Sequence, residues 1–142
     1  MDQLIKGQKA IVRRFYEEFW NKRNFEAIHD LMKEDVIFRG SLGADMNGHT
    51  GVKRYAEIVF HAFPDFTITL EEMISENSKL AACLSYSGTH EGELFGIPST
   101  GKQINYVGTG IFIFADGLIS HCWVLGDRLE MLRQMSRNEN SN

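Results

Sequence analysis

GTHEGELFGIPSTG, residues 88–101, lies between two runs of residues that are typical of β-strands. The stretch holds four glycines and one of the chain's two prolines, so it predicts a loop. Loops of this length are uncommon inside a compact domain, and they are often functional. His90 lies where the first strand ends, and it is therefore a candidate functional residue.

Helical patterns dominate the chain before this loop. Apolar spacing predicts a helix over about residues 8–21, whose four aromatic residues form a stripe broader than one packing seam needs. Either a large core or a cavity lined by part of the stripe explains this breadth. A short helix is expected after Asn24, a short strand over residues 36–38, and a third helix over about 50–63, which stops at Pro64.

The rest of the chain is rich in strand patterns. Apolar and polar residues alternate over residues 66–71, which indicates a half-buried strand, and residues 80–87 form the next strand. After the loop, residues 103–114 and 118–125 form a hairpin, and a last helix covers about 127–135. Helices followed by consecutive strands predict an α+β fold, with an antiparallel sheet that the helices cover on one face.

The hairpin around residues 115–117 allows two registers. A two-residue Asp-Gly loop would pair Phe112 with His121, whereas a three-residue loop would pair Phe112 with Ser120 and Gly110 with Cys122. A slip of one residue moves every side chain of one strand to the other face.

Composition limits the functions of the chain. Its 142 residues predict one domain, residues 1–142, with a polar tail over 136–142. The formal net charge of −4 argues against a nucleic-acid partner, and no apolar run is long enough to span a membrane. Cys83 and Cys122 lie in strand patterns and are expected to be buried, reduced thiols, which favours a cytoplasmic location.

Several segments together resemble the SnoaL-like polyketide cyclase family, within the nuclear-transport-factor-two-like and ketosteroid isomerase-like superfamily. The strongest is the loop over residues 88–102. The others are VRRFY at 12–16 with WN at 20–21, GVK at 51–53, FPD at 63–65, FADG at 114–117, and Trp123 with Asp127. The resemblance covers nearly the whole chain.

The resemblance implies a cone-shaped fold, in which a strongly curved sheet wraps around the N-terminal helices and encloses an apolar pocket. It implies homodimers. It also favours the three-residue hairpin loop, because relatives place positions 110 and 124 in one pocket. The pocket residues it implies are Trp20, Tyr106, Gly110, Phe112, Cys122 and Val124.

The catalytic residues of relatives are missing from this chain. The key histidine and aspartate of the founding cyclases fall on Gly110 and Val124. The general-base aspartate of ketosteroid isomerases falls near Gly40, and their acidic pocket aspartate again falls on Gly110, whereas their helix-one tyrosine matches Tyr16. The resemblance therefore implies the pocket more strongly than the chemistry.

Four residues remain as catalytic candidates. Enol chemistry needs a base and an oxyanion donor. Tyr16 is the candidate donor, or else a core aromatic, and Arg39 is a second donor, or else a solvated surface residue. His90 and Asp127 are the candidate bases, but a histidine can fix a loop and an aspartate at a helix start can cap it.

The sequence supports two functions. The first is a cofactor-independent enzyme of cyclase or isomerase type that acts on a small, apolar, carbonyl-containing molecule. The alternative is a non-catalytic protein that binds such a molecule in the same pocket, since positions 110 and 124 are Gly110 and Val124. No cofactor is expected. No metal site is expected either, because the histidines lack ligand spacing.

Overall fold

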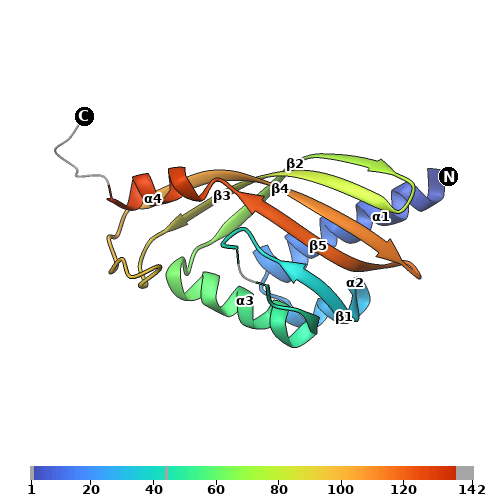
Figure 1. The fold of residues 1–142 in the computed structure, drawn as a ribbon, viewed down its shortest axis with the longest axis horizontal. Coiled ribbons are helices and arrows are strands. Elements are labelled where there is room, and N and C mark those ends of the chain that lie inside the picture. The colour runs from blue at the N-terminus through green and yellow to red at the C-terminus, as the bar shows by residue number, and fades with distance from the viewer. Residues whose placement is uncertain (1, 44, 137–142) are drawn as a thin grey trace.

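A computed structural model describes residues 2–43 and 45–136. A long, twisted sheet lies over α1 and α3 (Figure 1). Among the described residues, no helix is long and apolar enough to cross a membrane. The elements in chain order are α1 (Asp2–Arg14), η1 (Phe15–Asn21), η2 (Phe25–Ala27), α2 (Ile28–Leu31), β1 (Met32–Arg39), α3 (Gly48–Ala62), β2 (Thr67–Glu76), β3 (Lys79–Thr89), β4 (Gln103–Ala115), β5 (Leu118–Gly126) and α4 (Arg128–Ser136).

The first helix begins earlier than its apolar pattern predicts and changes type partway. α1 begins at Asp2, and the chain continues from Phe15 as the π-helix η1. A π-helix is wider than an α-helix and is found at functional sites. The four aromatic residues of η1 are all buried: Phe15, Tyr16, Phe19 and Trp20. The wider turn accounts for the broad aromatic stripe.

The α+β class is confirmed, but the sheet is mixed rather than wholly antiparallel. Its strand order is β1-β5-β4-β3-β2. The pairs from β2 to β5 are antiparallel, whereas β1 runs parallel to β5. Short turns join β2 to β3 and β4 to β5, and a longer loop joins β3 to β4, whereas most of the domain separates β1 from β5. The direction of β1 is therefore set by packing and not by a turn.

The hairpin between β4 and β5 follows neither predicted register. Asp116 and Gly117 form a two-residue turn with φ angles of 54° and 80°. A bulge at Ser120 then shifts the pairing, so that Phe112 faces Cys122 and Gly110 faces Val124. The three-residue loop is wrong, but the expectation that positions 110 and 124 share a face is confirmed.

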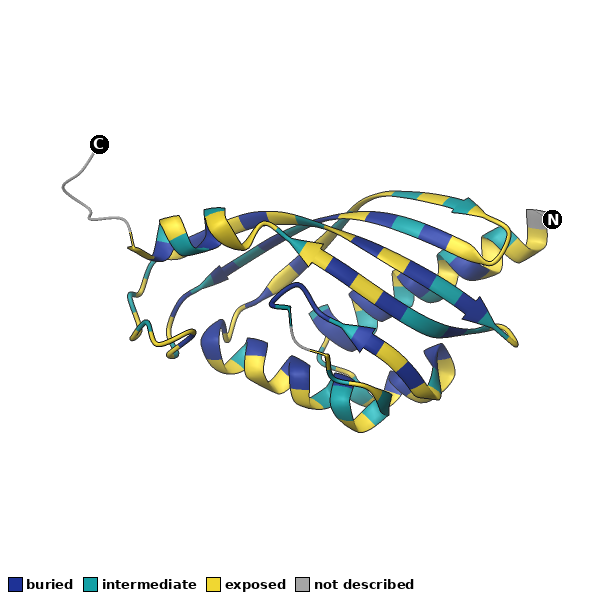
Figure 2. Ribbon diagram, in the orientation of Figure 1, coloured by how far each residue is buried: buried dark blue, intermediate teal, exposed yellow. Residues whose placement is uncertain are grey.

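Burial alternates along the strands, as Figure 2 shows, because one sheet face packs on the helices. β3 follows this alternation along nearly its whole length. The opposite face of the sheet keeps large apolar side chains in solvent, among them Val107, Ile111, Trp123 and Leu125. Cys122 is buried as expected, whereas Cys83 is exposed, and both are free thiols.

The loop predicted over residues 88–101 is a connection that begins at His90, because β3 extends to Thr89. The backbone N–H of His90 donates to Lys102 O, and His90 O accepts from the N–H groups of Thr100 and Gly101. The loop is also tied to the end of α3, since Ala62 O accepts from the N–H groups that follow His90. Of the predicted polar tail, Ser136 ends α4 and residues 137–142 lie outside the described residues.

Candidate functional site

A small cavity lies between η1, α3 and the covered face of the sheet. Its volume is about 20 Å³, which is room for about one water molecule. A larger ligand can enter only when the lining side chains move apart. The lining residues are Phe15, Tyr16, Trp20, Phe38, Gly40, Ser41, Tyr55, Val59, Phe66, Ile68, Tyr86 and Val124.

Tyr16 is the polar group of η1 in this cavity. Its side chain is buried, and its hydroxyl has no hydrogen-bond partner among the described residues. Burial, the largest cause, and then the neighbouring Cys122 raise the pKa of Tyr16 well above its usual value. The hydroxyl therefore stays protonated, and it is a hydrogen-bond donor with no acceptor.

Gly110 lies beside this hydroxyl at a crowded position, because a Cβ atom there would lie only 3.1 Å from Cε1 of Phe112. A Cβ atom at position 110 would lie 3.3 Å from the Tyr16 hydroxyl and 3.5 Å from a methyl group of Val124. A side chain at position 110 would therefore point toward Tyr16. Because the chain has glycine there and valine at position 124, neither position places an acid or a base beside Tyr16.

Gly40 makes room for a second tyrosine. A Cβ atom at position 40 would lie only 2.1 Å from Cζ of Tyr55, so the ring occupies the space that a side chain would need. The Tyr55 hydroxyl accepts from the N–H of Leu42 at 3.1 Å and lies 3.2 Å from the Ser41 hydroxyl. The Ser41 hydroxyl also lies 3.5 Å from that of Tyr106. This hydroxyl cluster is hydrogen-bonded, unlike Tyr16.

The two candidate bases do not line the cavity. His90 is buried, with Nδ1 2.9 Å from Oγ1 of Thr100 and its ring against Phe63. Burial lowers its pKa, and Nε2 has no hydrogen-bond partner among the described residues. Asp127 is exposed, and its carboxylate accepts from the N–H of Glu130 at the start of α4. His90 therefore fixes the loop and Asp127 caps α4, and neither side chain reaches the cavity.

Arg39 also lies outside the cavity. Its Nη1 donates to Val124 O at 2.7 Å, and its guanidinium lies 5.3 Å from the centre of the Trp123 ring. The side chain is half-buried at the end of β1. Among the described residues, no group of three or more His, Cys, Asp or Glu could hold a metal ion.

The expected pocket residues divide into two groups. Trp20 and Val124 line the cavity, whereas Gly110 is not a lining residue and only lies beside Tyr16 and Val124. Tyr106, Phe112 and Cys122 are buried but are not lining residues. Sequence reasoning missed Ser41, Tyr55 and Tyr86 as lining residues. For Tyr55 the signal was its place on the inner face of α3, which does not distinguish a cavity from an ordinary core.

The fold and the cavity together define the class of protein. A curved sheet lies over N-terminal helices, and the apolar cavity between them is lined in part by tyrosine and serine side chains. Residues 10–135 match the family described as SnoaL-like polyketide cyclase, and the chain belongs to this family. No curated protein sequence gives a significant match.

Solved structures share the fold at low sequence identity. One is a candidate SnoaL-like polyketide cyclase from Jannaschia sp. CCS1, with 17% identity, a TM-score of 0.85 and 94% of each chain covered. A second is a candidate polyketide cyclase from Acidithiobacillus ferrooxidans, with 25% identity, a TM-score of 0.77, and 91% of this chain and 94% of that chain covered. A third is a SnoaL-like polyketide cyclase from Agrobacterium tumefaciens, with 20% identity, a TM-score of 0.77, and 91% and 98% covered.

Proposed function

We propose that the central cavity binds a small, apolar, carbonyl-containing molecule and that Tyr16 donates a hydrogen bond to its carbonyl oxygen. The observation that carries this proposal is the buried Tyr16 hydroxyl without a partner. A buried donor without an acceptor costs free energy, and a carbonyl oxygen in the cavity would recover it. The reaction that fits is cyclisation or isomerisation through an enol, without a cofactor.

Tyr16 is suited to the oxyanion part of such a reaction. As an enol carbon attacks a carbonyl carbon, negative charge develops on the carbonyl oxygen. A hydrogen-bond donor in a dry site stabilises that charge more than a donor in water does. The raised pKa of Tyr16 keeps its proton in place for this role.

The described lining of the central cavity lacks a carboxylate or imidazole that could accept the proton in this reaction. No Asp, Glu or His is among the lining residues. The substrates that fit best are therefore those that enolise readily by themselves, such as 1,3-dicarbonyl compounds. The candidate bases, His90 and Asp127, would have to approach by movement of their segments.

The absence of a base from the described cavity lining also supports a second function, which is binding of the molecule without catalysis. Ligand capture from a cell extract, followed by mass spectrometry, separates the two functions. Turnover of the captured carbonyl compound supports the enzyme, whereas stoichiometric release of an unchanged compound supports the binding protein.

The role of Tyr16 can be measured with 2-naphthol, whose hydroxyl and flat apolar body imitate an enol. Trp20 lines the cavity, so binding is expected to change its fluorescence. Replacing Tyr16 by Phe removes only the hydroxyl, and we expect affinity to fall roughly tenfold, the usual effect of one lost hydrogen bond.

Tyr55→Phe is the matched control, because the Tyr55 hydroxyl already has partners within the protein. It should change the affinity for 2-naphthol much less than Tyr16→Phe does. Equal losses in the two variants, or no loss in Tyr16→Phe, would contradict the role of Tyr16.

A homodimer is the proposed assembly. Val107, Ile111 and Leu125 lie on the outer face of the sheet and are 56%, 37% and 55% exposed. An apolar patch on one sheet face is typical of a protein interface. The cytoplasm is the proposed location, because it keeps thiols such as Cys83 and Cys122 reduced.

A further inference from the structure

Two arginine side chains meet outside the central cavity, on either side of Gly43. Arg39 reaches this place from the end of β1 and Arg128 from the start of α4. A Cβ atom on Gly43 would lie 2.7 Å from Nη1 of Arg128 and 3.4 Å from Nη2 of Arg39. Neither guanidinium forms a salt bridge with a described carboxylate. Two close positive charges that form no salt bridge attract an anion.

Both guanidinium groups are held in place. Nη1 of Arg39 donates to Val124 O at 2.7 Å, and Nη1 of Arg128 donates to Leu42 O at 2.6 Å. Each also lies over an aromatic ring, Trp123 for Arg39 and Phe95 for Arg128. Their other nitrogens have no acceptor among the described residues. Anchored guanidiniums with unused donors are suited to carboxylates, which they bind through two parallel hydrogen bonds.

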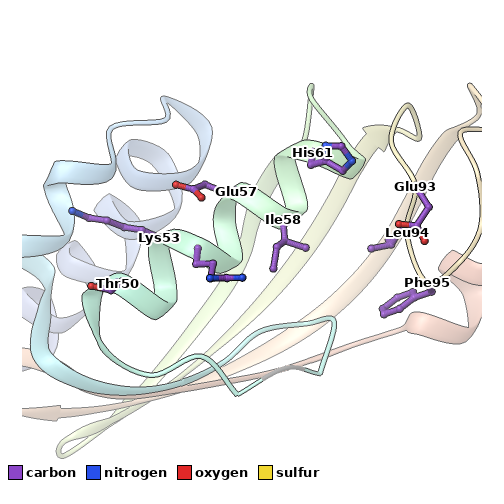
Figure 3. A pocket seen from close by; sticks show the side chains of 9 residues that line it. Thr50, Lys53, Glu57, Ile58, His61, Glu93, Leu94 and Phe95 are labelled. Atoms are coloured by element: carbon purple, nitrogen blue, oxygen red, sulfur yellow. The ribbon is translucent and has the colours of Figure 1, made fainter.

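Phe95 connects the arginines to an apolar groove. Its ring lies 5.7 Å from Cζ of Arg128, and it also lines a groove of about 830 Å³ between α3 and the loop that follows β3. Figure 3 shows Ile58 on α3, with Leu94 and Phe95 on the facing loop. Ile58 and Phe95 are 42% and 50% exposed, so the groove presents apolar surface to solvent.

The groove itself carries no excess charge. Lys53 and Arg54 are balanced by Glu57 and Glu93, which line the same groove. Lys53 is also paired with Glu26 at 3.1 Å. The two arginines, which form no salt bridge with a described carboxylate, lie beyond Phe95, so the groove has an apolar part and a cationic end.

The geometry points to a second binding site, in which Arg39 and Arg128 hold the carboxylate of an apolar molecule whose body lies across Phe95 in the groove. This site lies apart from the central cavity and does not depend on Tyr16. Segment 40–43 lies between the two sites, since Gly40 and Ser41 line the cavity while Leu42 O accepts from Arg128.

Octanoate and octanol are suitable probes, because they share an apolar chain and differ in charge. Isothermal titration calorimetry should show octanoate binding to the full chain at least roughly tenfold more tightly than octanol, the effect of one charge-assisted hydrogen-bonded pair. Arg128→Gln and Arg39→Gln should each remove most of this difference and leave octanol binding unchanged.

Three controls make the result specific. Arg133→Gln removes an exposed cation of α4 that does not line the groove, and it should leave the preference for octanoate in place. Ile58→Asp should weaken both probes. Tyr16→Phe should leave octanoate binding unchanged, so failure of this site and failure of the central cavity give different results.

Equal affinity for octanoate and octanol would overturn the proposal. So would equal effects of Arg128→Gln and Arg133→Gln. A third contrary result is a change of oligomeric state in Arg39→Gln or Arg128→Gln without loss of octanoate binding, because the arginines would then face a second copy of the chain. Sizing of each variant by light scattering provides that measurement.

Discussion

Tyr16 and Tyr55 are buried tyrosines beside the same cavity, and they differ in one respect. The Tyr55 hydroxyl accepts from the N–H of Leu42 and contacts Ser41, whereas the Tyr16 hydroxyl has no partner among the described residues. Identical chemical changes at the two positions should therefore have opposite effects on the free energy of unfolding.

Tyr16→Phe removes a buried hydroxyl that makes no hydrogen bond with the described residues. We expect the free energy of unfolding to rise by about 1 kcal/mol. Tyr55→Phe leaves the Leu42 N–H without its acceptor and should lower the free energy of unfolding by about 1 kcal/mol. Urea unfolding of both variants checks the prediction, which fails if Tyr16→Phe is the less stable of the two.

Gly40 provides a second test at the scale of one residue. A Cβ atom there would overlap the Tyr55 ring, so Gly40→Ala should force the ring to move and lower the free energy of unfolding by about 2 kcal/mol. Gly7→Ala is the control, because a Cβ atom in that part of α1 meets nothing within 4 Å. It should stabilise the protein by about 0.5–1 kcal/mol. Thermal unfolding measures both, and equal effects would contradict the close contact.

The loop between β3 and β4 is the element with a predicted pH dependence. His90 anchors it from a buried site, and burial lowers the pKa of the imidazole. In the unfolded chain the imidazole takes up a proton below about pH 6.5, but in the folded protein it does so only at lower pH. The unfolded state therefore binds more protons in this window, and stability falls as the pH decreases below about 6.5.

His90→Asn should flatten this part of the pH profile, because an amide can meet Thr100 without titrating. Urea unfolding at intervals between pH 5 and 8 measures the difference. His61→Asn is the control, since His61 is exposed on α3, and its profile should follow that of the parent chain. A His90→Asn profile parallel to the parent profile would show that another group causes the dependence.

Element boundaries were predicted well where the pattern is local. The hairpin strands and α4 lie within one or two residues of their predicted ranges, since alternation and helical spacing depend on neighbouring residues. The bulge at Ser120 was missed, because it depends on how β5 packs and pairs rather than on its own alternation. The π-helical geometry of η1 was also missed, although the breadth of its aromatic stripe was the visible sign.

At the scale of the whole molecule, the outer face of the sheet presents a group of exposed apolar side chains, among them Val107, Ile111 and Leu125. Val107→Asp places a charge on this surface, and we expect it to dissociate the proposed homodimer into monomers. Leu4→Asp is the control, because Leu4 is 50% exposed on α1, away from that face. Light scattering of both variants distinguishes the outcomes, and a parent chain that is monomeric at high concentration would refute the dimer.

The sequence by itself determined the order of the elements, the α+β class and the resemblance to the family to which the chain belongs. These depend on patterns within short segments and on segments that match in order. Only the tertiary structure decided that β1 runs parallel to β5, that Gly110 faces Val124, that the Tyr16 hydroxyl has no partner, and that Arg39 meets Arg128. Each of these is a relation between segments far apart in the chain, which packing sets and local periodicity does not record. The loop over residues 88–101 carries the strongest resemblance to the family, but the cavity and the arginine pair are formed chiefly by other segments.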